Sequence, residues 1–167
     1  SPAGVRGLLG CPAAALSGVV AGGAQIRLPI DDDGHARIAE ASSWRERYDL
    51  LDERLLAAAA RADPGETPAS LRMAWWLLAR RHGRHRIETL AAEVGWSRRR
   101  LATAFTPEVG LSPKRVATVM RFHHAYRLAQ SSGDTLAEVS VRCGYADQAH
   151  MSREWRRLAG RSPAATL

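Results

Sequence analysis

The feature that most constrains the fold is an internal repeat of about 50 residues in the second half of the chain. Two segments match with an offset of 49 up to a glycine and of 50 beyond it. The matching pairs are Leu90 and Val139, Val94 and Cys143, Gly95 and Gly144, Ser97 and Asp147, Leu101 and Met151, Phe105 and Trp155, Gly110 and Gly160, and Ser112-Pro113 and Ser162-Pro163. A duplicated unit of this length predicts two copies of one supersecondary structure.

Both copies have the pattern of a short helix, a tight turn and a second helix. The first helices are expected at 87–94 and 136–143, where an amphipathic segment ends at a glycine suited to a left-handed turn. Ser97 and Asp147 then stand at the N-cap positions of the second helices, whose apolar residues are spaced by four. This order predicts a helix-turn-helix in each copy.

The second helix of each copy is expected to be a recognition helix that enters the major groove of DNA. Because the apolar pair sets its inward side, the opposite side and the N-terminal residues face outward. The candidate DNA-binding residues are Arg98, Arg99, Arg100, Ala102, Thr103 and Thr106 in the first copy, and Gln148, Ala149, His150, Ser152, Arg153 and Arg156 in the second. Arg can bond guanine, Gln can bond adenine, and Ala and Thr methyls can contact thymine. The alternative is a solvated surface, and for Arg156 and Arg157 a phosphate contact or plain surface is favoured over a base contact.

A long connecting helix is expected between the copies, at 113–130. Pro113 suits a first helical turn, and Gly133 follows the end. A spacing of roughly 34 Å, one DNA turn, lets two recognition helices enter successive major grooves. The predicted fold is mainly α: helix-turn-helix units at 87–106 and 135–158 joined by this helix, preceded by a short, partly β segment and a helical connector.

The charge of the chain is concentrated in the repeat-bearing half. The net charge is +7; residues 1–64 hold seven Arg against nine acidic residues, and residues 65–167 hold 17 Arg or Lys against eight. A net charge of +9 in the second part predicts a polyanionic partner, with a solvated Arg-rich surface as the alternative. Cys11 and Cys143 are too few for a disulfide framework and lack zinc-ligand spacing, so a cytoplasmic location is expected.

The first part of the chain begins with an apolar run at 5–24. Arg6, Pro12 and two adjacent glycines weaken a membrane-spanning helix or signal peptide there, so part of a folded domain is favoured. A strand is expected at 25–30, a turn at 31–34 and one helix at 35–61. Along this helix runs an apolar stripe that is assigned to ordinary helix packing in preference to a dimer seam: Trp44, Tyr48, Leu51, Leu55 and Ala59.

Several other side chains are assigned to the core. Trp96 and Tyr145 follow the turn glycines and are expected to plug the core of each unit. Cys143 takes an apolar position of the repeat. Trp75 and Trp76 are expected to pack within a preceding helix and not to stack on nucleotides.

An enzyme is the first rival class. His82 and His85 are assigned to a basic helix end, and the adjacent His123 and His124 point in different directions, so no metal site is expected. The sequence has no Gly-rich phosphate loop, nucleophile elbow or pair of catalytic carboxylates, so neither catalysis nor a cofactor is expected. A fusion to a DNA-repair methyl acceptor would need an activated cysteine, and nothing gives Cys11 such a setting. The other rival is a basic helical interaction module that binds RNA or an acidic protein, against which the doubled unit argues.

The basic half resembles the DNA-binding part of the AraC/XylS family of transcription regulators. The residues that carry the resemblance are Leu90-Ala91, Gly95, Ser97, Leu101, Phe105, Gly110 and Ser112-Pro113 in the first unit, Arg121-Phe122, Ala125 and Leu128 in the connecting helix, and 144–153 with Trp155, Gly160, Ser162 and Pro163 in the second. The second unit is the more diagnostic, because Gly-aromatic-x-Asp-x-x-x-apolar-x-Arg marks it in this family. Two residues depart from the family pattern: Thr103 stands where Arg is common, and Met151 where Phe is usual.

The resemblance implies a sequence-specific regulator that binds double-stranded DNA through two recognition helices. Its implied partners are promoter DNA, RNA polymerase and a second copy of the protein held through an upstream domain, with no membrane contact. Residues 1–30 would then be the remnant of that domain, 31–66 a helical connector and 67–167 the DNA-binding domain.

Overall fold

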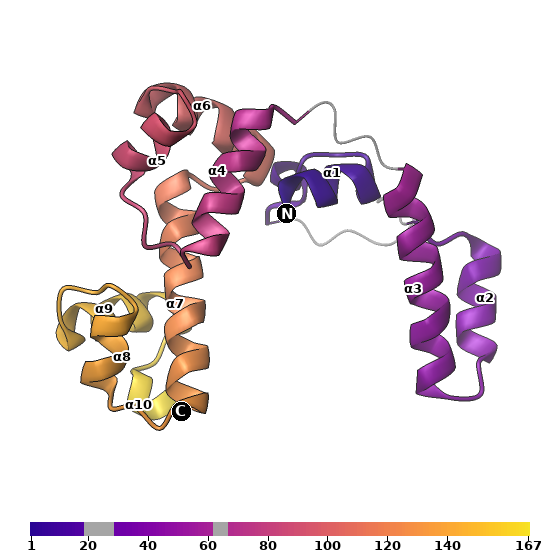
Figure 1. The fold of residues 1–167 in the computed structure, drawn as a ribbon. Helices are drawn as coiled ribbons and strands as arrows, with labels where there is room; N and C mark the ends of the chain where they lie inside the picture. Colours follow the sequence, from indigo (N-terminus) through magenta and orange to yellow (C-terminus); the bar gives the residue numbers. More distant parts are fainter. Residues whose placement is uncertain (19–28, 62–66) are drawn as a thin grey trace. The chain divides into compact units, whose positions relative to one another are not determined.

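The computed structural model describes residues 1–18, 29–61 and 67–167, drawn in Figure 1. Its elements are α1 (Pro2–Leu9), η1 (Ala13–Leu16), α2 (Asp32–Glu40), α3 (Trp44–Arg61), α4 (Ala69–Arg80), α5 (Ile87–Glu93), α6 (Arg98–Val109), α7 (Pro113–Ser131), α8 (Leu136–Arg142), α9 (Gln148–Ala159) and α10 (Pro163–Thr166). The mainly α fold is confirmed, and none of the described residues lies in a strand. The strand expected at 25–30 falls mostly outside them.

The chain divides into two compact units. The first consists of Ser1–Arg72 with Ala104–Gly110, and the second of Met73–Thr103 with Leu111–Leu167. The second unit therefore contains both copies of the repeat, apart from the last turns of α6.

The start of α2 corrects the turn predicted at 31–34. Oδ1 of Asp31 accepts a hydrogen bond from the backbone N of Gly34 at 2.8 Å and so caps the helix. That bond holds the pKa of the Asp31 carboxyl below its usual range. Two more aspartates in the first turn suit the positive end of the helix dipole, so the acidic run starts a helix where a turn was predicted.

The single helix predicted at 35–61 is also wrong, because the chain breaks at 41–43. Oε2 of Glu46 accepts hydrogen bonds from the backbone N and the Oγ of Ser42, both at 2.9 Å. In a continuous helix the backbone N of Ser42 would donate to a backbone carbonyl oxygen. Here it donates to the Glu46 side chain instead, which favours a break in the helix at this point. The result is two helices, α2 and α3, which pack side by side within the first unit (Figure 1).

The apolar stripe of α3 is not covered as predicted. Trp44 is 68% exposed and Tyr48 is 60% exposed. Their rings lie 6.0 Å apart, and the guanidinium of Arg47 lies over the Trp44 ring at 5.0 Å. Leu55 and Ala59 are exposed as well, so the assignment of this stripe to ordinary helix packing is wrong for all of its residues except the partly buried Leu51.

An ion pair anchors α1 on the last turns of α6 within the first unit. Nη2 of Arg6 lies 2.6 Å from Oε1 of Glu108, and Nε donates to Oε2 at 3.2 Å. The two side chains are 17% and 16% exposed. A two-point bond between guanidinium and carboxylate is among the stronger polar contacts in proteins, so it fixes this end of α6.

Both copies of the repeat form the predicted helix, turn and helix. Gly95 separates α5 from α6, and Gly144 separates α8 from α9. Their φ angles are 72° and 74°, in the left-handed region that favours glycine. The connecting helix α7 ends one residue beyond its predicted end.

The paired apolar positions of the two recognition helices lie in the interior. Leu101, Phe105, Met151 and Trp155 each have 0% exposure, which confirms the predicted inward sides. Cys143 is buried as well, and burial raises the pKa of its thiol. A protonated, buried thiol behaves as a small apolar side chain.

Two predictions about tryptophans are wrong. Trp96 is only partly buried, and the guanidinium of Arg100 lies over its ring at 4.9 Å, whereas its counterpart Tyr145 is buried. Trp76 is 48% exposed, with Arg80 over its ring at 4.9 Å. A cation above the face of an indole is attracted to it and covers it, so these rings stay near the surface.

Candidate nucleic-acid interface

The outward side of α9 is an open groove. Its lining consists of five of the residues predicted for the second recognition helix: Gln148, Ala149, Ser152, Arg153 and Arg156. All of them are exposed except Ser152, which is partly buried. One side of α9 thus presents an amide, a methyl, a hydroxyl and two guanidinium groups, the groups that bond base edges and phosphates.

His150 was predicted to contact DNA from the same side, but its side chain contacts residues just before α9. Its ring lies edge-on to Tyr145, with centroids 5.4 Å apart. Its Nδ1 lies 3.4 Å from the backbone N of Ala146 and can accept from it. These contacts stabilise the turn between α8 and α9.

Side chains cap both recognition helices at the predicted positions. Oγ of Ser97 accepts from the backbone N of Arg100 at 3.1 Å, and Oδ1 of Asp147 accepts from that of His150 at 2.5 Å. Each cap occupies a backbone donor at the end of the helix that would enter a groove.

The first recognition helix presents a different set of groups. Arg98 donates to Oε1 of Glu88 on α5 at 2.8 Å, in a pair whose side chains are largely exposed. Arg99, Thr103 and Thr106 are exposed on α6. This side of α6 therefore has fewer side chains that can make two-point bonds to bases than the side of α9.

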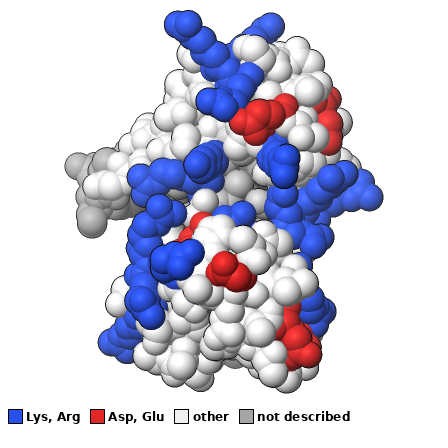
Figure 2. Space-filling model, turned by 90° about the vertical axis from the view of Figure 1, so that its left-hand side faces the viewer, with Lys and Arg blue, Asp and Glu red and all other residues white. Residues whose placement is uncertain are grey.

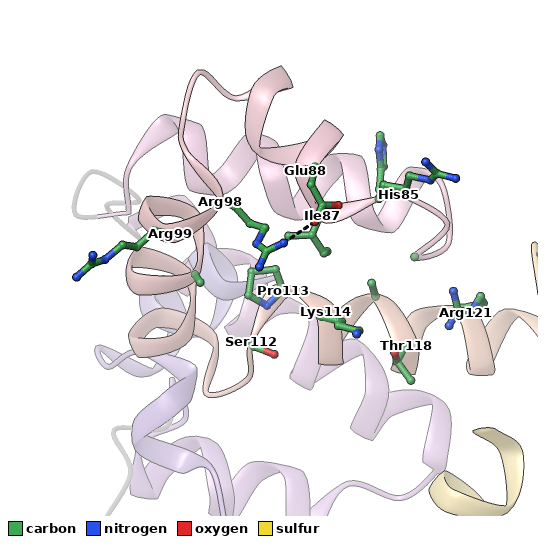
Figure 3. A pocket seen from close by; sticks show the side chains of 14 residues that line it. His85, Ile87, Glu88, Arg98, Arg99, Ser112, Pro113, Lys114, Thr118 and Arg121 are labelled. Atoms are coloured by element: carbon green, nitrogen blue, oxygen red, sulfur yellow. Dashed lines mark hydrogen bonds and ion pairs between the residues drawn. The ribbon is translucent and has the colours of Figure 1, made fainter. Parts of the chain in front are cut away.

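A cleft of about 630 Å³ opens beside α6. Figure 3 shows Arg98 reaching from α6 to Glu88, Lys114 and Arg121 placed along α7, and Arg99 extending away from the cleft. Its lining includes Arg98, Arg99 and Ala102 of the predicted set, together with Arg86, Lys114, Thr118 and Arg121, which were not predicted. For Arg86 and Lys114 the available sequence signal was the basic character of the chain before α5 and at the start of α7.

A buried ion pair, also not predicted, joins α7 to the second recognition helix. Nη2 of Arg121 lies 3.0 and 2.9 Å from the two carboxylate oxygens of Glu154, whose side chain is 8% exposed. The guanidinium also lies over the Tyr145 ring at 4.7 Å from its centroid. Burial raises the pKa of the Tyr145 hydroxyl, so the phenol beside the pair stays neutral. The sequence feature that could have indicated this ion pair is Glu154, the single carboxylate within the Arg-rich helix α9.

The turn between α4 and α5 contacts both the connecting helix and the second helix-turn-helix. A side chain at Gly83 would overlap the carbonyl oxygen of Ala117, so this glycine permits a close approach to α7. Nη1 of Arg84 donates to the carbonyl oxygen of Arg142, at the end of α8, at 3.1 Å. A Cβ added to Gly144 would lie 3.1 Å from Cδ of Arg84. The turn that precedes the first copy therefore contacts the turn of the second.

Two histidines stack where this turn meets α7. The rings of His82 and His124 lie 4.0 Å apart with an angle of 10°. Burial lowers the pKa of His124, and the nearby His82, Arg84, Arg142 and Arg127 lower it further. The described part of the chain holds no group of three or more His, Cys, Asp or Glu side chains that could bind a metal ion.

Positive charge covers much of the face drawn in Figure 2, where Lys and Arg side chains predominate over acidic ones. No helix among the described residues is long and apolar enough to cross a membrane. The basic face of Figure 2 is suited to a polyanionic partner.

Comparisons with known proteins place the second half of the chain in one family. The helix-turn-helix domain family matches residues 90–167. The chain is 35% identical to the HTH-type transcriptional regulator Rv1931c of Mycobacterium tuberculosis over 81 residues, which are 48% of this chain and 31% of that protein. It is 32% identical to the HTH-type transcriptional activator RhaS of Klebsiella pneumoniae over 76 residues, which are 46% of this chain and 27% of that protein. The match thus spans less than a third of either relative.

Solved structures agree with this assignment. The DNA-binding domain of AdpA, described as a global transcriptional factor and solved in complex with a target DNA, is 32% identical, covers 58% of this chain and 87% of its own, and has a TM-score of 0.53. A transcriptional regulator of Chromobacterium violaceum with an AraC-type DNA-binding domain covers 57% of this chain and 87% of its own at 24% identity and a TM-score of 0.53, which supports the fold. The chain therefore carries an AraC-type helix-turn-helix DNA-binding domain.

Proposed function

We propose that the chain is the DNA-binding part of a transcription regulator that reads a bipartite site with α6 and α9 in successive major grooves. The observation that carries the proposal is the groove on α9, lined by five side chains that the repeat pattern places on its outward side. A capped recognition helix in each copy supports it, since both helix starts are fixed by side-chain hydrogen bonds. Binding, and not catalysis, is the proposed activity.

The two helices are proposed to contribute unequally. Gln148 and Arg153 on α9 can make two-point bonds to adenine and guanine. On α6, Arg98 and Arg100 are engaged with Glu88 and with an indole ring, so Arg99 and exposed Thr103 are the side chains proposed to face the bases. We expect the half-site read by α9 to have the stronger base preference.

The part of the chain before α4 is proposed to serve regulation. In this proposal residues 1–30 belong to an upstream regulatory domain, 31–66 are a helical connector and 67–167 bind DNA in the cytoplasm. A second copy of the protein and RNA polymerase are the proposed protein partners, the first through the upstream region and the second at the promoter.

In vitro selection of duplex DNA with this chain tests the proposal. We expect recovery of one motif with two half-sites about one DNA turn apart. Uniform weak binding to all duplexes would contradict sequence-specific regulation. Tighter binding to RNA or to an acidic protein than to any duplex would favour a basic interaction module.

A further inference from the structure

The cleft beside α6 contains positive charge that carboxylates in the described part of the chain do not neutralise. Arg98 and Arg121 line the cleft, but each is already paired with a glutamate. Arg86 and Lys114 also line it, both are exposed, and no ion pair within the described ranges involves either of them. Arg99 also lines the cleft and is exposed, but its side chain extends away from it (Figure 3), so Arg86 and Lys114 are the cations that remain available to an anion in the cleft.

The position of the cleft suggests which anion. Lys114, Thr118 and Arg121 are spaced by four and three residues, so they share one side of α7. That side adjoins the N-terminal part of α6, because Arg98 and Ala102 line the same cleft. Figure 3 shows this arrangement, with Lys114 on α7 opposite the Arg98–Glu88 pair. The basic surface thus continues from a recognition helix onto the connecting helix.

We propose that this cleft binds the sugar-phosphate backbone of DNA between the two major-groove segments, with Lys114 and Arg86 contacting phosphates. The inference rests on the proposed function. Two recognition helices in successive major grooves leave an intervening length of backbone, and the helix that connects them lies next to it. Glu88 repels a phosphate at the Arg98 end, so the contacts fall to Lys114 and Arg86. Contacts of this kind add affinity and fix register without reading sequence.

The test compares the salt dependence of DNA binding among variants of the full chain. The probe is a labelled duplex recovered by selection with the wild type, and a random duplex of equal length runs beside it. Lys114→Gln and Arg86→Gln each remove one cleft cation. Arg115→Gln is the matched control, because exposed Arg115 lies next to Lys114 on α7 but lines another groove with Arg157 and Leu158.

Each cleft variant is expected to lower the slope of log affinity against log salt by about 0.9, the value for one phosphate contact. The ratio of wild-type affinity to variant affinity should then fall about threefold between 50 and 200 mM salt. The loss should be equal on the selected and the random duplex. Arg115→Gln should keep the wild-type slope, and Lys114→Arg, which retains the charge, should bind as the wild type does.

Ethylation of single backbone phosphates locates the contact. Ethylation between the two major-groove segments should block binding of the wild type, and this block should vanish for Lys114→Gln. If Lys114→Gln and Arg115→Gln have the same slope and the same interference pattern, the backbone site is wrong, while specific binding by the wild type leaves the proposed function standing. A wild type that binds no duplex overturns both.

Discussion

Nη2 of Arg121 lies within 3.0 Å of both carboxylate oxygens of Glu154, so a buried ion pair ties the connecting helix to the second recognition helix. With side chains 19% and 8% exposed, the pair has lost most of its hydration. Such a pair contributes little net stability but becomes costly when one partner is removed. The pair therefore sets the orientation of α9, and with it the direction of its outward side, while its net contribution to the free energy of folding is small.

Removing one partner of this pair should destabilise the protein strongly. We expect Arg121→Met to lower the free energy of unfolding by about 3 kcal/mol, because Glu154 is left buried without its cation. The double variant Arg121→Met with Glu154→Leu should recover much of that loss, since no unpaired charge remains. Urea unfolding followed by tryptophan fluorescence measures both values.

Glu88→Gln is the control for this prediction. It breaks the Arg98–Glu88 pair, whose side chains are 70% and 64% exposed, and should change the free energy of unfolding little, because solvent screens this pair. A loss for Arg121→Met no larger than that of Glu88→Gln would contradict the structural importance of the buried pair.

The repeat made most of the second unit predictable. Gly95 and Gly144 can take a left-handed backbone at low cost, and the apolar residues that follow repeat at helical spacing, so turn, helix and inward side were all encoded locally. The same periodicity placed Arg153 on the outward side of α9, and a place near the helix N-terminus indicated Gln148; both line the groove on that side. Whether they contact bases is not a property of the helix alone, so that assignment stays a prediction.

Contacts between distant segments could not be predicted. The Arg121–Glu154 pair spans 33 positions and the Arg84–Arg142 bond spans 58, and no local pattern specifies either partner. Side-chain capping also ended a helix that the prediction had continued: the bonds between Ser42 and Glu46 mark a break just before the apolar stripe, which lies wholly within α3. The capping box of α8, in which Thr135 and Glu138 bond each other's backbone N, did have a readable Thr-x-x-Glu signal.

A base contact by Arg153 should reveal itself as a loss of specificity. We expect Arg153→Ala to weaken binding to the selected duplex by about 1–3 kcal/mol and binding to a random duplex by less. Arg157→Ala is the matched control, since this exposed arginine of α9 lies outside the outward groove. Fluorescence anisotropy with both duplexes measures the difference, and equal losses on the two would make Arg153 a phosphate contact.

Arg84 should restrict the spacing between half-sites. Its guanidinium bonds the end of α8 and its stem lies against Gly144, so it links the turn before the first helix-turn-helix unit to the second unit. Arg84→Met keeps the stem but removes the bond to the Arg142 carbonyl. We expect the wild type to lose affinity when one base pair is inserted between half-sites, and the variant to lose less, with binding to an isolated half-site unchanged. Identical spacing profiles would show that α7 alone sets the distance.

His124 and His85 should make folding stability fall in mild acid. Burial lowers the pKa of His124 below its usual 6.5, and the surrounding positive groups act in the same direction; burial also lowers that of His85. Between the lowered values and 6.5 the unfolded chain binds more protons than the folded one, so the free energy of unfolding falls as the pH drops through about 6.5. In His124→Gln this fall should be smaller, with the remainder due to His85. Denaturant unfolding at several pH values measures it, and a variant as pH-sensitive as the wild type would exclude His124 as a source.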